Sequence, residues 1–409
     1  MKKKVGIITM HKVPNFGSAL QAYALQRKVD ELGYDAELID YHYPNKYHCA
    51  KQGLTYFPQR STFRLFVLNV AARLMLALCF NKFKSKAEEC VERYELQKNY
   101  RRFYKKFFKL SRFYGSIKSI CENPPDYDIY MTGSDQVWNP RFVANDPVFF
   151  LDFAGGGKPR LSYAASMSSS RIGKEFEDSY KAYLEKYAAV SVREKSTAEI
   201  VSRMTDRGVN VVCDPSLLLN KGEWLGICPK KPLVKESYLL LYIQSYSYDP
   251  YPHIVSFTKE LAEKLGLKVV VLMGLRDGYS IDGAITFETA GPFEFLQLFR
   301  DARFVVTTSF HGTAFALNFG KDFYSVVKEI NGDDCRIADF LRQCSAEHHL
   351  LEIDSLDHIE NLPQANTAES EVQKLQEFRG QSLDFLREAL RQYDRMSFTI
   401  IKATRMKPR

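Results

Sequence analysis

The stretch Val305–Gly320 combines a histidine with hydroxyl side chains at a point where a strand gives way to a helix. Val305 and Val306 are typical of a buried strand end, and Thr313–Phe319 has helical spacing. The first N–H groups of a helix lack intrahelical partners and lie at the positive end of its dipole, so they suit a phosphate or carboxylate. His311 could bind such an anion or give it a proton. The alternative is a capping turn with a packed histidine.

Other polar residues follow strands nearer the N-terminus. Asp135 comes after an apolar run, so its carboxylate could orient an acceptor hydroxyl or take its proton; the alternative is an Asx turn that satisfies its own loop. The loop after the first strand could contact an acceptor or a donor, or simply cap the next helix. Amides and an apolar ring are groups with which sugars are often held. The acceptor-binding residues that we predict are Asn15, Gly17, Gln136, Trp138 and Asn139.

The elements around these loops alternate between short apolar strands and helices. In the first half we predict strands at Val5–Met10, Ala36–Ile39, Tyr127–Thr132, Arg160–Ala165, Ala188–Arg193 and Val209–Cys213, and helices at Gly17–Leu32, Lys174–Tyr187 and Glu194–Met204. In the second half we predict strands at Tyr238–Ile243, Lys268–Leu272, Phe304–Thr307 and Phe323–Val326, and helices at Ile254–Leu265, Pro292–Asp301 and Thr313–Phe319. This alternation predicts an α/β protein with two doubly wound, Rossmann-like domains facing a cleft.

A chain of 409 residues is too long for one ordinary core and fits two domains of roughly 150–200 residues each. We expect an N-terminal domain over residues 1–214 with an insertion at about 41–122, and a linker over 215–234. A C-terminal domain should cover 235–365, followed by a helix and tail over 366–409. Apolar spacing in Glu369–Tyr393 predicts a helix that packs back across both domains.

Composition narrows the class of protein. Hydrophobic residues make up 45% of the chain, which indicates a globular fold, and the first apolar run ends at Met10, too early for a signal-peptide core. We therefore expect a cytoplasmic protein with reduced cysteines, since its 8 cysteines form no Cys-x-x-Cys pair. The formal net charge of +8 is modest and favours an anionic small substrate or a membrane surface over nucleic acid.

The insertion contains an apolar segment beside a basic one. Phe63–Phe80 is nearly all apolar, but Arg64 and Arg73 interrupt it, so we do not expect a spanning helix. The basic and aromatic run Lys82–Tyr114 follows. An apolar helix beside cations suits an interfacial anchor on an anionic leaflet, so region 56–114 is predicted to contact the inner face of the cytoplasmic membrane peripherally. The alternative is a buried helix with a solvated basic neighbour.

Several motifs, read in order, resemble those of the polysaccharide pyruvyl transferase family. They are Asn15–Tyr23 (NFGSALQAY), Gly133–Asn139 (GSDQVWN), Ser162–Ser166 (SYAAS), Val192–Glu194 (VRE), Asp214-Pro215 and Ser309–Gly312 (SFHG). The resemblance covers roughly Lys4–Val327 without the insertion. It implies a GT-B-like architecture and transfer of a pyruvyl group from phosphoenolpyruvate to two hydroxyls of one sugar, which forms a cyclic ketal. It implies no metal and no organic cofactor.

The resemblance also implies catalytic roles. Arg193 matches the family's arginine in the N-terminal domain, and His311 matches its catalytic histidine; we add Asp135 as the third catalytic residue. An arginine fork suits the phosphate and carboxylate of phosphoenolpyruvate, although a structural pair of Arg193 with Glu194 or Asp214 is the alternative. As a general acid, His311 would protonate either the methylene carbon of the enol or the departing phosphate, and the sequence leaves both open.

One departure from the family pattern concerns the donor. Well-known members carry Arg-x-His where this chain has Ser309-Phe310-His311. Arg276, in the loop after the predicted strand Lys268–Leu272, is our prediction for the missing charge. The donor-binding residues that we predict are Ser309, Gly312, Thr313 and Arg276. The remaining histidines, such as His253, His348 and His349, are expected at the surface.

Phosphoenolpyruvate and a sugar, expected to be a lipid-linked precursor of a bacterial surface polysaccharide, are therefore the predicted ligands. Two other classes fit parts of the pattern. A GT-B glycosyltransferase that uses a nucleotide sugar would have the same cleft between domains. A non-enzymatic protein that binds the membrane surface would depend on the insertion alone, and it leaves the settings of Arg193 and His311 unexplained.

Overall fold

The structure, a computed structural model, describes residues 2–42, 62–77, 84–332, 334, 336–357 and 359–405, with backbone only at 62–65, 361 and 393–405. Its N-terminal sheet is parallel, with the order β2-β1-β3-β4. These strands are β1 (Lys4–Ile8), β2 (Asp35–Leu38), β3 (Ile129–Thr132) and β4 (Arg160–Ser162). A parallel pair, β5 (Val190–Val192) and β6 (Val209–Val211), continues this sheet beyond β4 through single bridges at Leu161–Ala189 and Ala165–Val192.

The C-terminal sheet is also parallel and has the order β12-β11-β10-β7-β8-β9. Its strands are β7 (Tyr238–Tyr242), β8 (Lys268–Leu272), β9 (Ile285–Phe287), β10 (Phe304–Thr307), β11 (Asp322–Val327) and β12 (Leu350–Glu352). The strand order reverses between β7 and β10, just as it reverses between β1 and β3 in the first sheet. Ligands of open α/β sheets bind at such reversals, outside the carboxyl ends of the strands.

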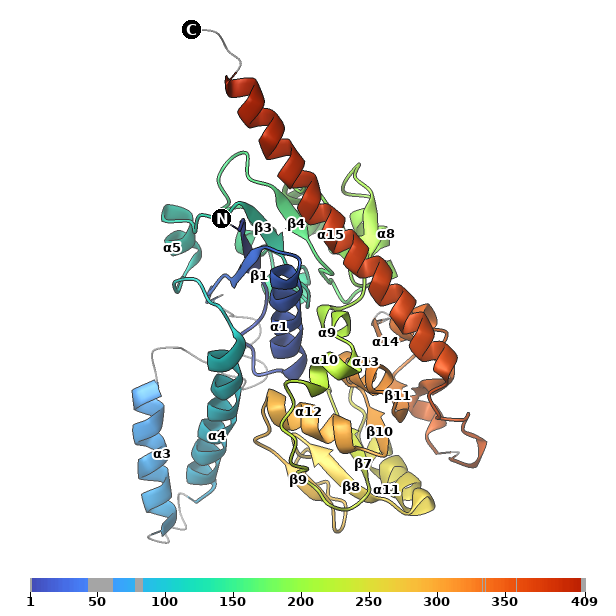
Figure 1. Ribbon diagram of the computed structural model, residues 1–409. Coiled ribbons are helices and arrows are strands. Elements are labelled where there is room, and N and C mark those ends of the chain that lie inside the picture. Colours follow the sequence, from blue (N-terminus) through green and yellow to red (C-terminus); the bar gives the residue numbers. More distant parts are fainter. Residues whose placement is uncertain are drawn as a thin grey trace.

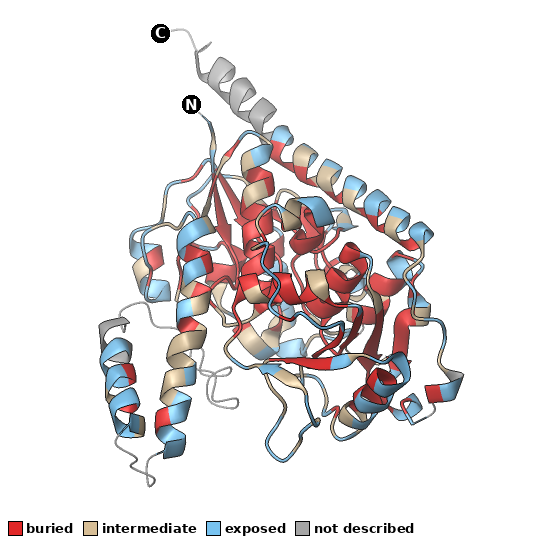
Figure 2. Ribbon diagram, turned by 60° about the horizontal axis from the view of Figure 1, so that its bottom comes forward, coloured by how far each residue is buried: buried red, intermediate tan, exposed pale blue. Residues whose placement is uncertain are grey.

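Helices cover both sheets (Figure 1). They are α1 (Phe16–Glu31), α5 (Ile117–Glu122), α6 (Pro140–Val143), α7 (Lys174–Leu184), α8 (Lys195–Val201), α11 (His253–Leu265), α12 (Pro292–Asp301), α13 (Phe310–Phe319) and α14 (Arg336–Gln343). Figure 2 shows the burial concentrated in the sheets and in the helices between them. Helices α1 and α13 are buried almost throughout because they lie where the two domains meet, whereas α7 and α11 have one solvated face.

Most predicted elements are present with ends shifted by a few residues. The shift that matters is in α13, which begins at Phe310 rather than Thr313. Ser309 is its N-cap: the Ser309 Oγ accepts a hydrogen bond from the Gly312 N–H at 3.3 Å. His311 therefore lies in the first turn of the helix and not in the loop before it. The sequence reading missed β9, β12 and α14, of which both strands are only three residues long.

The segment between the domains is helical rather than irregular. It contains α9 (Pro215–Leu218) and α10 (Lys221–Leu225), and Leu217, Leu218 and Trp224 are buried there. Helix α9 packs between α1, α13 and α15 (Glu369–Arg405). The predicted return of the C-terminal helix across both domains is confirmed, because the Cys213 N–H donates to Ser382 Oγ at 2.9 Å and Arg379 bonds to Asn318 at 2.8 Å.

Two helices of the insertion, α3 (Thr62–Ala77) and α4 (Lys84–Phe107), pack against each other (Figure 1). The C-terminal half of α4 belongs to the core: Tyr100 and Phe103 are fully buried, and Asn99 Nδ2 donates to the Thr289 carbonyl at 2.8 Å. Other parts of the predicted anchor, at 56–61 and 78–83, lie outside the described residues. Within the described chain, none of the helices is apolar over a length sufficient to cross a bilayer.

Candidate active site

A cavity of about 580 Å³ opens where the reversal points of the two sheets face each other. The loops after β1, β3, β7 and β10 supply much of its wall, as expected for parallel sheets. The structure brings together there six of the residues predicted from the sequence: Asn15, Asp135, Gln136, Asn139, Ser309 and His311. Residues from both domains therefore share one site.

His311 is fixed by contacts from both domains. Its Nε2 lies 3.5 Å from Asp214 Oδ2, and its side chain is 10% exposed. The imidazole also lies so close to the start of α1 that a Cβ on Gly17 would be 1.9 Å from His311 Nδ1. Phe310 packs edge-on against the imidazole at 5.2 Å between ring centroids. The histidine is thus held between α9 and α1 while it still borders the cavity.

Asp214 is the buried carboxylate behind the histidine. Its Oδ1 accepts from the Ser216 N–H at 2.9 Å, which caps α9, and its Oδ2 accepts from Ser134 Oγ at 3.0 Å and from Arg193 Nη1 at 2.9 Å. Burial alone would raise the pKa of Asp214, but the neighbouring His311 and Arg193 outweigh it and hold that pKa well below its usual range. An ionised carboxylate beside an imidazole fixes the orientation of the ring.

Arg193 does not project into the large cavity. Its Nε donates to Glu194 Oε1 at 2.6 Å, its Nη1 to Asp214, and its Nη2 to Ser166 Oγ at 3.2 Å. The guanidinium also lies 4.3 Å from the centroid of the Phe310 ring, and the side chain is only 2% exposed. The structural pairing with Glu194 and Asp214 is therefore what forms. Competition from these two buried carboxylates draws the fork away from a substrate, and Arg193 positions Asp214 instead.

Asp135 lines the cavity in a left-handed backbone conformation, with φ of 75°. Its Oδ1 accepts from the Gln136 N–H at 2.9 Å, and its Oδ2 accepts from Ser18 Oγ. The carboxylate therefore bonds within its own loop, but to the next residue rather than to the residue two positions on that an Asx turn requires, and it still borders the cavity. Backbone conformations of this kind are uncommon for residues other than glycine and cluster at functional sites. Beside it, Asn139 Nδ2 donates to Gln136 Oε1 at 2.7 Å, and Asn139 Oδ1 accepts from the Arg141 N–H at 3.0 Å, which caps α6.

Two predicted acceptor residues lie behind the wall rather than on it. Trp138 is fully buried and stacks on Phe150 at 5.7 Å between centroids, so its ring is unavailable to a sugar. Gly17 lies against the His311 ring, where its lack of a side chain makes room for the imidazole. Asn15 both caps α1, by accepting from the Ser18 N–H at 3.2 Å, and lines the cavity, so the two readings of this residue are compatible.

Three predicted donor residues also lie off the cavity wall. Thr313 Oγ1 donates to the Ser309 carbonyl at 3.0 Å inside the helix, and Gly312 is packed so tightly that a Cβ would approach Thr307. Arg276 lies in an exposed loop, where it pairs with Asp249 at 2.7 Å and stacks on nearby tyrosines. A local anion thus holds Arg276, and the structure does not bring it to the cavity.

The sequence reading missed three cations that line the cavity, Arg141, Lys328 and Arg336. Arg336 forms a two-pronged pair with Asp334, at 2.7 and 2.6 Å, and this pairing raises the pKa of Arg336 against the opposing effect of burial. Burial would raise the pKa of Asp334, but Arg336 lowers it to about 2. Arg141 lines the cavity too, and among the described residues no carboxylate forms an ion pair with it. The sequence does contain a signal for Arg141. Asn139-Pro140 is typical of a helix start, and this places Arg141 at the end of the loop that contains Asp135.

The model of the polysaccharide pyruvyl transferase family matches residues 15–327. The chain belongs to this family. The match includes the six cavity residues that were predicted from the sequence, and it ends before Lys328 and Arg336. It makes the protein a pyruvyltransferase of polysaccharide biosynthesis. No curated protein matches the sequence.

Solved structures give the fold of this pyruvyl transferase. The chain is similar to the UDP-GlcNAc 2-epimerase from Methanocaldococcus jannaschii, with a TM-score of 0.50, 11% identity and coverage of 93% of this chain and 99% of that one. UGT89C1 from Arabidopsis thaliana is 12% identical over 96% of this chain and 100% of its own, with a TM-score of 0.48. The likeness to the epimerase confirms two Rossmann-like domains in a GT-B arrangement, and at this identity it shows the fold alone.

Proposed function

We propose that the enzyme transfers the pyruvyl group of phosphoenolpyruvate to two hydroxyls of one sugar and forms a cyclic ketal. The observation that carries the proposal is the pair of Asp214 and His311 at the wall of a cavity that also presents cations. A doubly ionised enol phosphate needs fixed positive charge, and a proton donor must reach its methylene carbon. Both requirements meet in one cavity of about 580 Å³, which is large enough for a small donor and a sugar.

Donor binding is assigned to groups on the C-terminal side and to one arginine opposite. At the N-terminus of α13, Ser309 caps the Gly312 N–H, and the N–H groups of Phe310 and His311 donate to none of the residues that the structure describes, so they can bind an anion. Arg141 supplies a fork for the carboxylate or phosphate, whereas Arg336 lines the same cavity but is paired with Asp334. Arg141 fills the role that the family's Arg-x-His arginine leaves open at Ser309.

Proton transfers follow from the same geometry. His311, protonated and held by Asp214, gives a proton to the methylene carbon of the donor, which becomes a methyl group and leaves an oxocarbenium ion at the adjacent carbon. The first sugar hydroxyl adds to that carbon as Asp135 takes its proton. The C–O bond to phosphate then breaks, and the departing phosphate takes the proton held by Asp135. The second hydroxyl adds to the oxocarbenium ion that remains and closes the ketal as its proton returns to His311. The reaction consumes one phosphoenolpyruvate and releases one phosphate.

The acceptor would lie on the N-terminal side of the cavity. Gln136 and Asn139 offer amide groups there, and Asn15 lies beside them at the start of α1. Amide pairs of this kind hydrogen-bond neighbouring hydroxyls of a pyranose. We assign the acceptor to a hexose of a bacterial surface polysaccharide precursor, carried on a lipid.

Thermal stability with candidate donors tests the donor directly. Phosphoenolpyruvate should raise the Tm of the wild-type enzyme, and Arg141→Ala should reduce that rise, because a ligand that binds only the folded state stabilises it. Arg276→Ala is the matched control, since it removes an arginine outside the cavity. A rise in Tm with nucleotide sugars and none with phosphoenolpyruvate would instead support the glycosyltransferase alternative.

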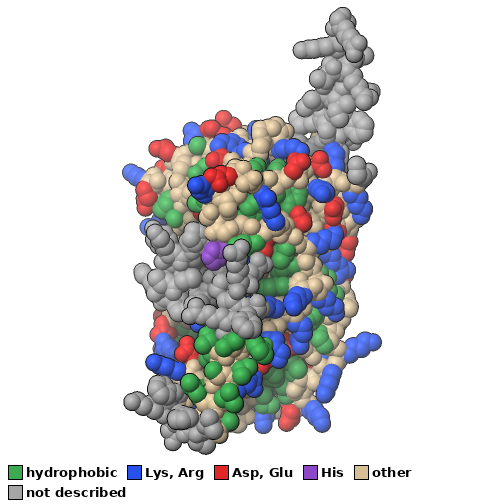
Figure 3. Space-filling model, turned by 90° about the vertical axis from the view of Figure 1, so that its left-hand side faces the viewer, with side chains coloured by type: hydrophobic (Ala, Val, Ile, Leu, Met, Phe, Trp, Pro, Cys, Tyr) green, Lys and Arg blue, Asp and Glu red, His purple; other side chains and the backbone are tan. Residues whose placement is uncertain are grey.

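If the acceptor is carried on a lipid, the enzyme must reach a membrane surface, and the exposed face of α3 is our candidate for that contact. Six large apolar side chains of α3 are 40–58% exposed: Phe66, Val67, Leu68, Val70, Leu74 and Met75. Figure 3 shows hydrophobic side chains gathered on this face of the molecule, with Lys and Arg beside them. The neighbouring helix α4 carries exposed cations such as Lys84 and Lys98. An apolar face flanked by cations fits an anionic leaflet, so we propose that α3 docks peripherally on the inner face of the cytoplasmic membrane.

Flotation with anionic liposomes tests this contact. Deleting the whole region 56–114 would remove Tyr100 and Phe103 from the core, so a point variant is cleaner. Leu74→Glu should weaken flotation at least severalfold, whereas Leu265→Glu, which changes a similarly exposed leucine of α11, should leave it intact. Equal flotation of both variants and the wild type would contradict the docking of α3.

A further inference from the structure

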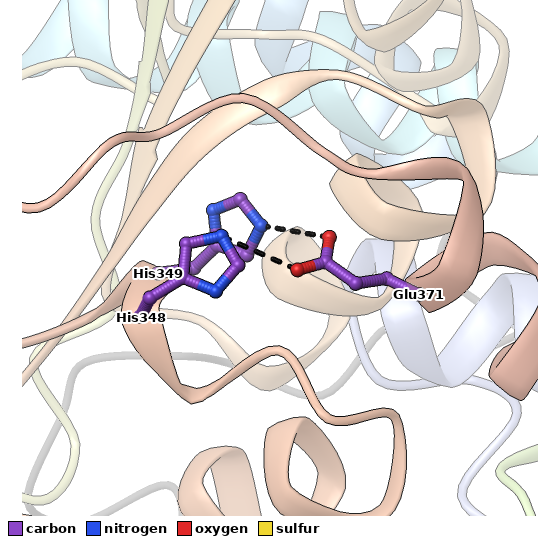
Figure 4. Close-up of side chains that lie close together, drawn as sticks. All are labelled: His348, His349 and Glu371. Atoms are coloured by element: carbon purple, nitrogen blue, oxygen red, sulfur yellow. Dashed lines mark hydrogen bonds and ion pairs between the residues drawn. The ribbon is translucent and has the colours of Figure 1, made fainter.

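Two histidines and a glutamate meet at the edge of the C-terminal sheet, outside the cavity (Figure 4). His348 and His349 end the short helical turn η4 (Glu347–His349) just before β12, and Glu371 lies in the first turn of α15. His349 is fully buried, contrary to the expected surface position, and Glu371 is 3% exposed. His348 is 37% exposed, which leaves the cluster open to solvent on one side.

The hydrogen bonds of His349 define which nitrogen is free. Its Nδ1 lies 2.9 Å from the Phe323 carbonyl, and its ring stacks on Phe323 at 3.8 Å between centroids. A carbonyl oxygen only accepts, so Nδ1 carries the hydrogen and donates it. The opposite nitrogen, Nε2, then directs a lone pair at Glu371 Oε2, 3.2 Å away. Two acceptors face each other there, which requires a cation between them, either a second proton on the ring or a metal ion.

His348 repeats this arrangement on the same carboxylate. Its Nε2 lies 3.2 Å from Glu371 Oε1, and the two imidazole centroids are 4.1 Å apart. One ligand atom from each of the three residues can be chosen so that all lie within 4.8 Å of one another. A tetrahedral site with bonds of about 2.0–2.1 Å has ligand–ligand edges of about 3.3–3.4 Å, and each oxygen of Glu371 lies at a similar distance, 3.2 Å, from the Nε2 of one of the two histidines.

We propose that His348, His349 and Glu371 bind a Zn²⁺ ion, with water at the remaining position on the exposed side. Two imidazoles and a carboxylate form a ligand set that zinc commonly takes. The bond from His349 Nδ1 to a backbone carbonyl is the outer contact that metal-bound histidines usually make, because it fixes both tautomer and ring orientation. The site is separate from the proposed pyruvyl transfer and departs from the expectation of a protein without metal.

The position of the cluster gives the ion a structural role. Glu371 also accepts from the Ala368 N–H at 3.0 Å and so closes the first turn of α15. Farther along α15, Arg379 bonds to the Leu217 carbonyl of α9 and Ser382 to the Cys213 N–H, next to Asp214. A metal at the start of α15 would fasten the helix to the edge of the sheet and thereby support the packing around α9. Binding only to the folded chain should raise its stability.

Zinc content and thermal stability of the full-length protein test the site. We expect wild-type protein dialysed against Zn²⁺ to retain one equivalent of zinc per chain. Its Tm should fall when EDTA is added. Co²⁺ in place of Zn²⁺ should give the visible absorption of a tetrahedral site. His348→Ala removes the exposed ligand without opening the core, and it should weaken metal affinity at least about tenfold. His253→Ala, which removes an exposed histidine paired with Asp357, should change neither value.

The outcomes separate a metal site from a proton-linked ion pair. Retained zinc that disappears in His348→Ala and in Glu371→Gln, with the Tm response lost in both, supports the proposal. Wild-type protein that holds no zinc after dialysis, and whose Tm is insensitive to both Zn²⁺ and EDTA, overturns it. Neither result depends on turnover, so failure of this site would leave the proposed reaction untouched.

Discussion

Gly17→Ala is the change whose effect follows most directly from the contacts of His311. Gly17 is the second residue of α1, where alanine would favour the helix by up to about 1 kcal/mol. Its Cβ, however, would lie 1.9 Å from His311 Nδ1, so the ring must retreat by about 1.5 Å to reach the ordinary contact distance of 3.4 Å. Overpacking of this kind costs about 1–3 kcal/mol, which outweighs the gain in propensity.

The expected loss of activity is larger than the loss of stability. Misplacing a catalytic group by about 1 Å can cost about 10²-fold in rate, so kcat of Gly17→Ala should fall by about that factor or more. Urea unfolding and initial-rate kinetics measure the two effects. Gly380→Ala is the control, because its Cβ meets nothing within 4 Å and it should stabilise α15 slightly.

A double-mutant cycle refutes or supports the steric reasoning. If the clash is with the imidazole, Gly17→Ala should cost little stability in a His311→Ala background, where the ring is absent. A cost that is the same in both backgrounds would contradict the assigned contact. If kcat of Gly17→Ala equals that of the wild type, the proposed catalytic role of His311 is wrong.

Three further predictions concern charged groups around the cavity. Asp214→Asn should lower stability in urea by about 3–5 kcal/mol, because Arg193 keeps a buried charge with one partner fewer, and it should reduce kcat by at least about 10²-fold; a fully active variant would exclude Asp214 as the orienting group. Arg141→Ala should raise the donor KM about tenfold, equivalent to about 1.4 kcal/mol, with Arg276→Ala unchanged; equal kinetics would remove Arg141 from the site. Arg336 lowers the pKa of Asp334 to about 2, so the ionised Asp334 carboxylate stabilises the folded state above pH 4, and this stabilisation, at most about 2 kcal/mol, is lost as the pH falls toward 2. The Asp334→Asn variant should not lose this stability on acidification. An acid-unfolding profile identical to that of the wild type would contradict the prediction.

The fold was largely predictable because strands of parallel sheets are buried on both faces. Continuous apolar runs such as Tyr238–Tyr242 and Phe304–Thr307 identify such strands without knowledge of their neighbours. Strands of three residues at a sheet edge, such as β9 and β12, give no such signal. Helix α4 was hidden for another reason: its basic surface masks a stripe containing Tyr100 and Phe103, and only tertiary packing shows that this stripe belongs to the core.

The positions of site residues that follow strand ends were predictable from the sequence. The position of a side chain was not predictable where neighbouring carboxylates compete with a substrate for it. Asp135 and His311 lie where the strand order required them to lie. Arg193 follows a strand in the same way, yet Glu194 and Asp214 bind its three nitrogens together with Ser166, a competition that sequence spacing does not reveal. In the same way, Arg141, which we propose supplies the charge missing at Ser309, is distant from Ser309 in the sequence. Spatial proximity, rather than local pattern, decides both cases.

Phosphate release measured together with product mass tests the proposed reaction most directly. The enzyme is supplied with phosphoenolpyruvate and a panel of lipid-linked hexose acceptors, and His311→Ala serves as the comparison. We predict one phosphate released per acceptor that gains the mass of one pyruvyl ketal, with both signals reduced by about 10²–10⁴-fold in His311→Ala. Glycosyl transfer from a nucleotide sugar, with phosphoenolpyruvate left unconsumed, would contradict the account.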